Sequence, residues 1–413
     1  MVKLGWIETT IGALVDNKQI SIQTGPFGTV LSASEYVDHG IPVISVREIR
    51  QGRIELFDET PAVSDYTYRK LPQFALKPYD LVFARKGNVD RSALIPRDTQ
   101  KLFLGSDGIR LRFSDPTLAK IVFHHVQSSQ TRQFLTVTAY GTTMAGLNET
   151  IISNIPICIP AISNEQQRIA EALSDMDELI FSLEKLIEKK KAIKQGAMQE
   201  LLTGKRRLPG FSGKWERFNL MKRSKIKARI GWQGLKKDEY LESGYAYLVT
   251  GTDFDNGIVH WNSCRYVDKE RYDADCNIQL KNDDLLITKD GSLGKTALVK
   301  GLNYPATLNS GVFVIRPLNS AYDSAFAYYI LSSFIFRDFL DKLSAGSTIT
   351  HLYQKDLDKF EFLLPPTEQE QKAIATVLSI IDTEIQSLEH KCTKAHQIKN
   401  GMMQQLLTGK IRV

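Results

Sequence analysis

Residues 160–205 of the sequence read PAISNEQQRIAEALSDMDELIFSLEKLIEKKKAIKQGAMQELLTGK, and residues 365–410 read PPTEQEQKAIATVLSIIDTEIQSLEHKCTKAHQIKNGMMQQLLTGK. The two stretches align without a gap, and 23 of their 46 positions are identical. The offset between them, 205 residues, is far longer than the roughly 20–50 residues of a solenoid repeat. The pattern therefore indicates a duplicated domain.

Both copies predict a long amphipathic helix. Apolar residues recur in each at alternating steps of four and three, which is the heptad spacing of a coiled-coil seam. The seam residues are Ile169, Leu173, Met176, Ile180, Leu183 and Ile187 in the first copy, and Ile374, Leu378, Ile381, Ile385 and Leu388 in the second. A helix of about 38 residues would span about 57 Å. Gly204 and Gly409 follow the seams as expected helix stops.

The regions before each helix repeat more faintly. LKPYDLVF (76–83) aligns with LKNDDLLI (280–287), and GNVDRSAL (87–94) aligns with GSLGKTAL (291–298). Short apolar runs separated by Gly, Pro, Asn and Asp predict strands, and helical stretches such as 321–342 lie between them. The predicted class is therefore α+β, with two similar mixed α/β domains.

Two seams of equal length can bury each other. We expect the two long helices to pair as an antiparallel coiled-coil spacer between the two domains, related by an approximate two-fold axis. The alternative is that each helix packs only on its own domain, but a helix of about 57 Å overruns a domain of this size. The predicted organisation is a first domain at 1–159, a spacer helix at 160–206, a second domain at 207–364 and a second spacer helix at 365–413.

Composition narrows the class of protein. The chain has 413 residues, of which 42% are hydrophobic and 24% charged, as in ordinary globular proteins and unlike collagens, disordered chains or disulfide scaffolds. No apolar run reaches the roughly 18 residues of a spanning helix, and MVKLGWIETTIG (1–12) lacks a signal-peptide core, so we expect a cytoplasmic protein. The net charge of +6 permits a nucleic-acid partner without requiring one. The cysteines, which form no CxxC pair, favour reduced thiols over a metal site: Cys158, Cys264, Cys276 and Cys392.

The sequence lacks the motifs of common active sites. GKT (294–296) fails as a phosphate-binding loop because Lys289 stands where the first glycine is needed. His124 and His125 have no third ligand at zinc-site spacing. We therefore predict no catalytic residue, no cofactor and no metal. The lysines of the first long helix favour a solvated face over a surface for phosphate or a partner: Lys189, Lys190, Lys191 and Lys194.

Loops that combine glycine, cations and small polar residues recur at corresponding places in both halves. Such residues suit DNA, because Arg and Lys bind phosphates or guanine, Asn can read adenine, and hydroxyls bind phosphate oxygens. Ordinary solvated loops are the alternative. The candidates in the first half are Arg47, Arg50, Arg85, Lys86, Asn88, Arg91, Thr142 and Thr143. Those in the second half are Lys289, Ser292, Lys295, Thr296, Asn309, Ser347 and Thr348.

Taken together, these motifs resemble the specificity subunits of type I restriction–modification enzymes. The resemblance covers essentially the whole chain. It rests on the P-x4-EQ pattern at the start of each long helix, the LLTGK segment at its end, RLPGFSGKWE (207–216), GSLGKTAL (291–298) and GSTITHL (346–352).

The resemblance implies a protein without an active site. Each of two target-recognition domains would read one part of a bipartite, asymmetric site on double-stranded DNA, and the helices would set the distance between the parts. Each side would recruit one modification subunit, which uses S-adenosylmethionine to methylate adenine, and restriction subunits would join that core. The alternative from the residues alone is a coiled-coil-linked, two-domain scaffold that does not bind DNA.

One loop departs from the family pattern. The second half has glycine at both ends of residues 291–294, whereas the first half has GNVD at 87–90. Asp90 would repel a phosphate, although it could accept a hydrogen bond from a cytosine amino group. We expect the lysines near these turns to contact phosphate, and we expect Arg85 or Arg91, whose planar fork can bind in bidentate fashion, to read a base.

Overall fold

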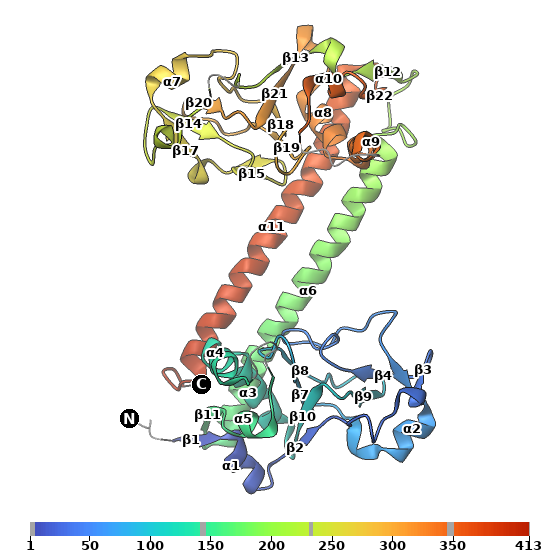
Figure 1. The fold of residues 1–413 in the computed structure, drawn as a ribbon, viewed down its shortest axis with the longest axis vertical. Coiled ribbons are helices and arrows are strands. Elements are labelled where there is room, and N and C mark those ends of the chain that lie inside the picture. The colour runs from blue at the N-terminus through green and yellow to red at the C-terminus, as the bar shows by residue number, and fades with distance from the viewer. Residues whose placement is uncertain (1–4, 141–145, 231–233, 345–350, 413) are drawn as a thin grey trace. The chain divides into compact units, whose positions relative to one another are not determined.

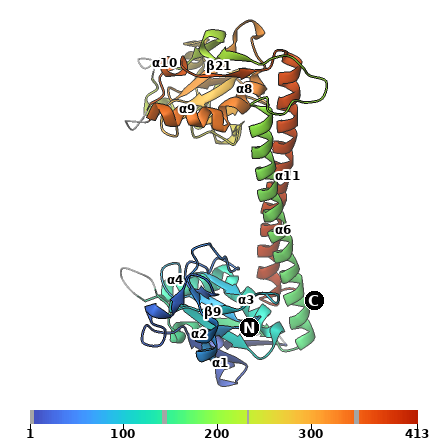
Figure 2. The same cartoon turned by 90° about the vertical axis from the view of Figure 1, so that its right-hand side faces the viewer.

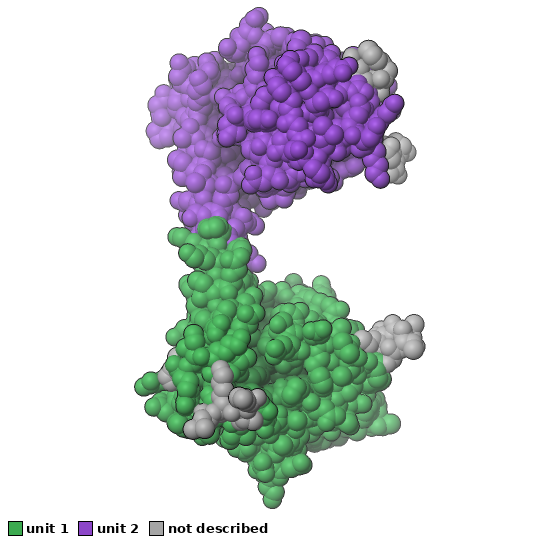
Figure 3. All heavy atoms as spheres, turned by 90° about the vertical axis from the view of Figure 1, so that its left-hand side faces the viewer, with its two compact units in different colours: residues 1–184, 390–413 green, residues 185–389 purple. Residues whose placement is uncertain are grey.

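The computed structural model describes residues 5–140, 146–230, 234–344 and 351–412. The chain divides into two compact units, one formed by residues 1–184 with 390–413 and the other by residues 185–389 (Figure 3). Each unit therefore combines a globular part with a portion of both long helices. Among the described residues, no helix is long and apolar enough to cross a membrane.

Unit 1 builds its globular part from short strands and helices (Figure 1). Its helices are α1 (Ile11–Asp16), α2 (Asp65–Lys70), α3 (Pro116–Gln127), α4 (Ser129–Thr138) and α5 (Glu149–Ser153). Its strands are β1 (Trp6–Thr10), β2 (Ile20–Thr24), β3 (Tyr36–Val37), β4 (Ile41–Ile44), β5 (Ala62–Val63), β6 (Ala75–Leu76), β7 (Leu81–Ala84), β8 (Ser92–Leu94), β9 (Leu102–Leu104), β10 (Gly108–Phe113) and β11 (Pro156–Pro160). They form sheets of order β2-β10-β7-β8, β3-β5-β4-β9-β6 and β1-β11.

Unit 2 repeats this plan. Its short helices are α7 (Lys269–Asp273), α8 (Ser324–Leu331), α9 (Phe334–Ser344) and α10 (Gln354–Leu357). Its strands are β12 (Glu216–Asn219), β13 (Ser224–Lys227), β14 (Ala246–Val249), β15 (Phe254–Asp255), β16 (Ile258–Val259), β17 (Arg265–Val267), β18 (Leu285–Thr288), β19 (Thr296–Leu298), β20 (Ala306–Leu308), β21 (Val312–Pro317) and β22 (Glu361–Leu364). The order β13-β21-β18-β19 matches β2-β10-β7-β8, and β12-β22 matches β1-β11. The predicted α+β class and the duplicated domain are confirmed.

The two predicted spacer helices are confirmed as α6 (Ser163–Leu201) and α11 (Glu368–Leu406). Within each unit they run side by side in both ribbon views (Figures 1 and 2). Two contacts in each unit show that they are antiparallel, because the partners on α11 fall in number as those on α6 rise. Asp177 meets Lys399 and Glu184 meets His396 in unit 1, and Lys191 meets Glu389 and Lys194 meets Asp382 in unit 2.

The seam residues face the interior to different degrees. Ile169, Leu173, Ile180, Ile374, Leu378 and Ile385 are buried, whereas Met176, Leu183, Ile187, Ile381 and Leu388 are half-buried. The fully buried ones mostly lie where a helix also packs on a domain core, as Ile169 does in unit 1 and Leu378 in unit 2.

The start of each long helix is fastened in the same way. The side-chain amide of Gln166 donates to the carbonyl of Pro160, and that of Gln371 donates to Pro365. The neighbouring buried carboxylate at the start of each helix pairs with an arginine that follows the end of the other helix. Glu165 pairs with Arg412 at 2.8 Å, and Glu370 pairs with Arg207. The P-x4-EQ pattern thus has a structural role, because its Glu and Gln hold the start of each long helix in place.

The helix stops lie against tryptophans. Gly204 and Gly409 have φ values of +69° and +62°, a left-handed backbone that favours glycine after a helix end. A Cβ at Gly409 would approach the Trp6 ring to 2.7 Å, and one at Gly204 would come within 3.2 Å of Trp215. The close approach gives a second reason why both positions are glycine.

One predicted helix is divided. The stretch 321–342 forms two helices, α8 and α9, instead of one. The break falls at Ser332 and Ser333, where the Ser333 hydroxyl accepts from the backbone N–H of Ile335 and so starts α9. Phe326, Ile330 and Phe336 of the two helices still bury their side chains in the unit 2 core.

Candidate nucleic-acid interface

Corresponding hairpins carry the main candidate residues in each unit. In unit 1, β7 pairs with β8 and the connection holds residues 85–91; in unit 2, β18 pairs with β19 and the connection holds residues 289–295. All residues of β7 and β18 are buried. A buried strand is a rigid mount, so each loop projects from a fixed base.

A buried ion pair braces each hairpin. Asp80 lies just before β7 and pairs with Arg112 of β10 at 2.7 Å, and Asp284 pairs with Arg316 of β21 at 2.6 Å. Each aspartate also accepts from a backbone N–H three residues earlier, that of Lys77 or Lys281. The sequence analysis did not identify this brace, although the aspartate recurs in the aligned LKPYD and LKNDD segments.

The first cations of the unit 1 loop already have partners. The Arg85 guanidinium lies over the Phe27 ring, 5.2 Å from its centroid, and is half-buried. Lys86 is exposed and pairs with Asp107 at 3.0 Å. Because Phe27 is itself 56% exposed, this aromatic and cationic pair remains at the surface, where Arg85 could turn towards a ligand.

The rest of this loop is held by its own polar groups. With its amide oxygen facing Arg91, Asn88 accepts from the Arg91 Nη2 at 2.6 Å. Asp90 pairs with Arg132 of α4 at 2.5 Å. Asp90 stands where the second half has Gly294. Arg132 neutralises the Asp90 carboxylate, which would otherwise repel a phosphate.

Arg47 and Arg50 lie on a separate loop after β4. Arg47 pairs with Glu59 and Arg50 with Glu55, each at 2.8 Å. Both guanidiniums also lie over the ring of Phe57, at 4.7 and 5.2 Å from its centroid. Each arginine therefore has a carboxylate that a DNA phosphate would have to replace.

In unit 2 the loop cations reach back over aromatic rings. Lys289 places its ammonium 5.4 Å from the Phe313 centroid, and Lys295 donates to the carbonyl of Gly251 at 2.9 Å. Ser292 is exposed at the tip. Gly291 and Gly294 have φ values of +70° and +74°, so both glycines are required by the turn itself.

Two other candidates in unit 2 are engaged inside the domain. Thr296 is 7% exposed, and its hydroxyl shares a hydrogen bond with Ser332 at 2.8 Å. Asn309 donates from its amide to the hydroxyl of Tyr240 at 2.9 Å. The Thr296 hydroxyl is therefore not at the surface, whereas Asn309 is only half-buried. The remaining candidates, Thr142, Thr143, Ser347 and Thr348, lie outside the described residues.

The helix lysines contact the neighbouring helix. Within unit 2, Lys190 pairs with Glu384, Lys191 with Glu389 and Lys194 with Asp382, at 2.5 to 2.7 Å. The predicted solvated face is therefore in part a set of cross-helix ion pairs. Lys191 and Lys194 also line a cavity of about 550 Å³ in unit 2, together with Lys295, Thr296 and Arg337. Asp382 and Glu389, the partners of Lys194 and Lys191, line it as well, so two of its four cations are already paired.

The two adjacent histidines are part of the unit 1 core. His124 and His125 lie on α3, and both are buried. Burial lowers the pKa of His125 to about 4, although the hydrogen bond to the carbonyl of Cys158 opposes this shift. Burial also lowers the pKa of His124 well below its usual value, with the Lys399 charge as the next cause. Both histidines are therefore neutral at pH 7.

Comparisons with known proteins agree on one family. A model of the type I restriction modification DNA specificity domain matches residues 28–195 and again residues 231–399. The MjaVIII specificity subunit of a type I restriction enzyme from Methanocaldococcus jannaschii is 28% identical over 68% of each chain. A second protein of that organism, provisionally named the MjaX specificity subunit, is 24% identical over 91% of this chain and 88% of its own length. The crystal structure of a type I S subunit from M. genitalium has a TM-score of 0.67 at 16% identity over 98% of both chains.

Proposed function

Because the chain belongs to the type I restriction–modification DNA specificity family, we propose that it reads a bipartite, asymmetric DNA site, with one domain for each part. The matching family model describes a DNA specificity domain, and the relatives are named specificity subunits. We infer that this chain recognises DNA and has no active site of its own. We assign the first part of the site to residues 1–159 and the second to residues 207–364. The helices at 160–206 and 365–413 would serve as the spacer.

One observation carries this proposal: the same braced hairpin occurs in both units with different loop residues. The strands of the hairpin and the buried ion pair, made by Asp80 in unit 1 and Asp284 in unit 2, are the same in both units. The loop sequences differ: RKGNVDR at 85–91 and KDGSLGK at 289–295. A shared frame keeps the geometry of DNA approach the same in both units. Different side chains on that frame can then select different bases.

We assign separate roles to the loop residues. Arg85 or Arg91 is proposed to read a base, since a guanidinium can bind guanine in bidentate fashion. Lys86, Lys289 and Lys295 are proposed to contact phosphates, together with Arg47 and Arg50 after they leave their glutamates. Asn88, Ser292, Asn309 and the residues outside the described ranges remain proposed contacts, and Thr296 is proposed to position the loop.

The spacer helices are proposed to recruit the other subunits. Each side of the pair would bind one modification subunit, which supplies S-adenosylmethionine chemistry to methylate adenine, and restriction subunits would join that complex. One neighbour of the same fold, with a TM-score of 0.52 and 16% identity, comes from a study of complex assembly in the type I restriction–modification system. Assembly on this chain is our proposal.

A domain exchange tests the division of labour. Residues 1–155 would be replaced by the corresponding segment of another specificity subunit, and methylated adenines would be mapped across the genome. We expect one half of the methylated motif to change, while the other half and the spacer length stay the same. A change in both halves would contradict the proposal. Loss of methylation at this motif in cells lacking the chain is the accompanying control.

The role of Lys289 can be tested in vitro. Lys289→Ala should weaken duplex binding about equally for all sequences and reduce the slope of log affinity against log salt by about one. Lys225→Ala is the matched control, because Lys225 is exposed on β13, at the opposite edge of the sheet from β19. A variant with an unchanged slope but a relaxed preference at one base pair would show that Lys289 reads a base instead.

A further inference from the structure

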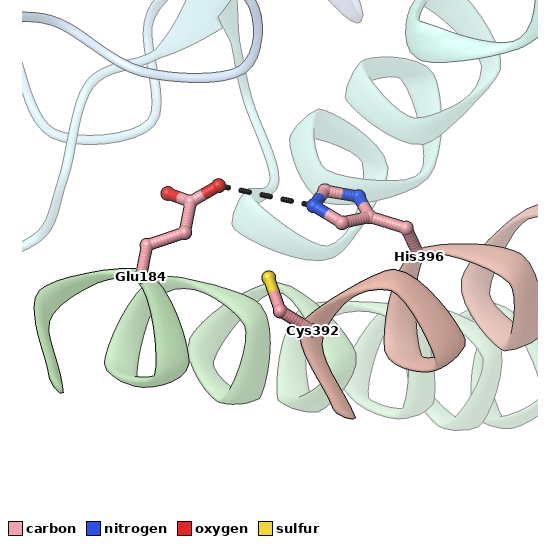
Figure 4. Close-up of side chains that lie close together, drawn as sticks. All are labelled: Glu184, Cys392 and His396. Carbon is pink, nitrogen blue, oxygen red and sulfur yellow. Dashed lines mark ion pairs between the residues drawn. The ribbon is translucent and has the colours of Figure 1, made fainter. Parts of the chain in front are cut away.

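Three metal-binding side chains meet on the paired helices of unit 1. Glu184 extends from α6, and Cys392 and His396 extend from α11 towards it (Figure 4). The carboxylate oxygen, the sulfur and a ring nitrogen all lie within 4.8 Å of one another. Glu184 Oε1 and His396 Nε2 are 3.8 Å apart.

The spacing along α11 brings two of these groups onto one face. Cys392 and His396 are four residues apart, so their side chains lie one above the other on the helix. Because the helices are antiparallel, Glu184 faces this pair from the other side. The sequence analysis found no metal site, since Glu184 is separated from the other two residues by more than half of the chain.

The donor set is the one that Zn²⁺ prefers. Thiolate, imidazole and carboxylate ligands bind zinc at about 2.0–2.3 Å, which places tetrahedral ligand atoms about 3.3–3.8 Å apart. The observed atoms therefore need to close by about 1.5 Å at most, which side-chain rotation can supply. With three protein ligands, the fourth position would be left for water.

The surroundings hold the carboxylate in place. Arg53 donates to Glu184 Oε2 at 2.8 Å, and the other oxygen is the one that faces His396. Such a bond to the outer oxygen is typical of ligating carboxylates.

The site is open to solvent. Glu184 and His396 have side chains 38% and 52% exposed, so an ion can enter from solvent. Burial and the nearby Glu184 charge raise the pKa of the Cys392 thiol, and a bound cation would displace that proton.

We propose that Glu184, Cys392 and His396 form a site for a zinc-class divalent metal ion that joins the two long helices within unit 1. The ion would link a residue of α6 to two residues of α11. It would fix the register of the helices at a place where the seam residues are only half-buried. This site is independent of DNA binding, and no reaction is assigned to it.

The test uses the full chain, freed of metal under reducing conditions and titrated with Co²⁺ and then Zn²⁺. We expect one Co²⁺ per chain with a thiolate-to-cobalt charge-transfer band, displacement of Co²⁺ by Zn²⁺, and a higher melting temperature in excess Zn²⁺. Cys392→Ser should abolish the band, and His396→Ala should weaken binding by about tenfold or more.

Cys276→Ser is the matched control, because Cys276 is an exposed thiol in unit 2. It should leave the band, the stoichiometry and the zinc-dependent melting shift unchanged. Circular dichroism of each variant without metal checks that the fold is retained. The proposal is overturned if the wild-type chain binds no stoichiometric Co²⁺, or if the charge-transfer band survives in Cys392→Ser.

Discussion

Replacing Arg316 with methionine should lower the free energy of unfolding of unit 2 by about 3–5 kcal/mol. Arg316 donates to both oxygens of Asp284, whose side chain is 6% exposed, and also to the backbone carbonyls of Asn277 and Gln279. Methionine preserves most of the volume but leaves a buried carboxylate without its counter-charge. The cost arises from that isolated charge more than from the lost pair.

The measurement is urea unfolding combined with hydrogen exchange of β18 and β21, which reports on unit 2 separately. Arg265→Met is the matched control, because Arg265 pairs with Glu242 at the surface and their side chains are 48% and 86% exposed. An exposed pair of this kind contributes about 1 kcal/mol or less. Equal losses in the two variants would show that the brace does not stabilise the hairpin.

Leu378→Asp should be nearly as damaging, with an expected loss of about 3 kcal/mol or more. Leu378 is fully buried where α11 contacts the unit 2 core, so the substitution removes apolar packing and buries an unpaired carboxylate. Leu183→Asp and Leu388→Asp should cost less, because both residues are only half-buried and water can reach the new charge.

Ile380→Asp is the control on the same helix, because the Ile380 side chain is 55% exposed. It introduces the same charge two residues away, and its effect should stay within about 0.5 kcal/mol. Thermal unfolding and co-purification with the modification subunit are the two measurements. If Leu378→Asp remains as stable as Ile380→Asp, the seam does not hold α11 in place.

The long helices could be predicted because their signal is local and duplicated. Heptad spacing needs only residues a few positions apart, and 23 identities between the copies fixed the alignment. The break between α8 and α9 was harder to predict from the sequence. The hydroxyl of Ser333, which separates α8 from α9, is a local competitor that apolar periodicity does not register.

The candidate site could be predicted only in outline. Loop composition and the two-fold recurrence located both hairpins. The partner of each charge was not predictable, because Asp90 meets Arg132 and Asp80 meets Arg112 only after distant strands and helices pack. The same holds for Thr296, whose burial follows from contact with α8 and not from its neighbours in the sequence.

The core of unit 1 contains residues from both ends of the chain. Met403, Leu406 and Leu407 pack in the same cluster as Ile169 and Leu173, whereas unit 2 is continuous from 185 to 389. During synthesis on the ribosome, the apolar face at Leu173 must therefore wait for more than 200 further residues, or about 10–50 s at typical elongation rates. The usual N-to-C order of folding is thus reversed in part: the second unit can close first, and the nascent first unit stays exposed to chaperones until the last helix emerges.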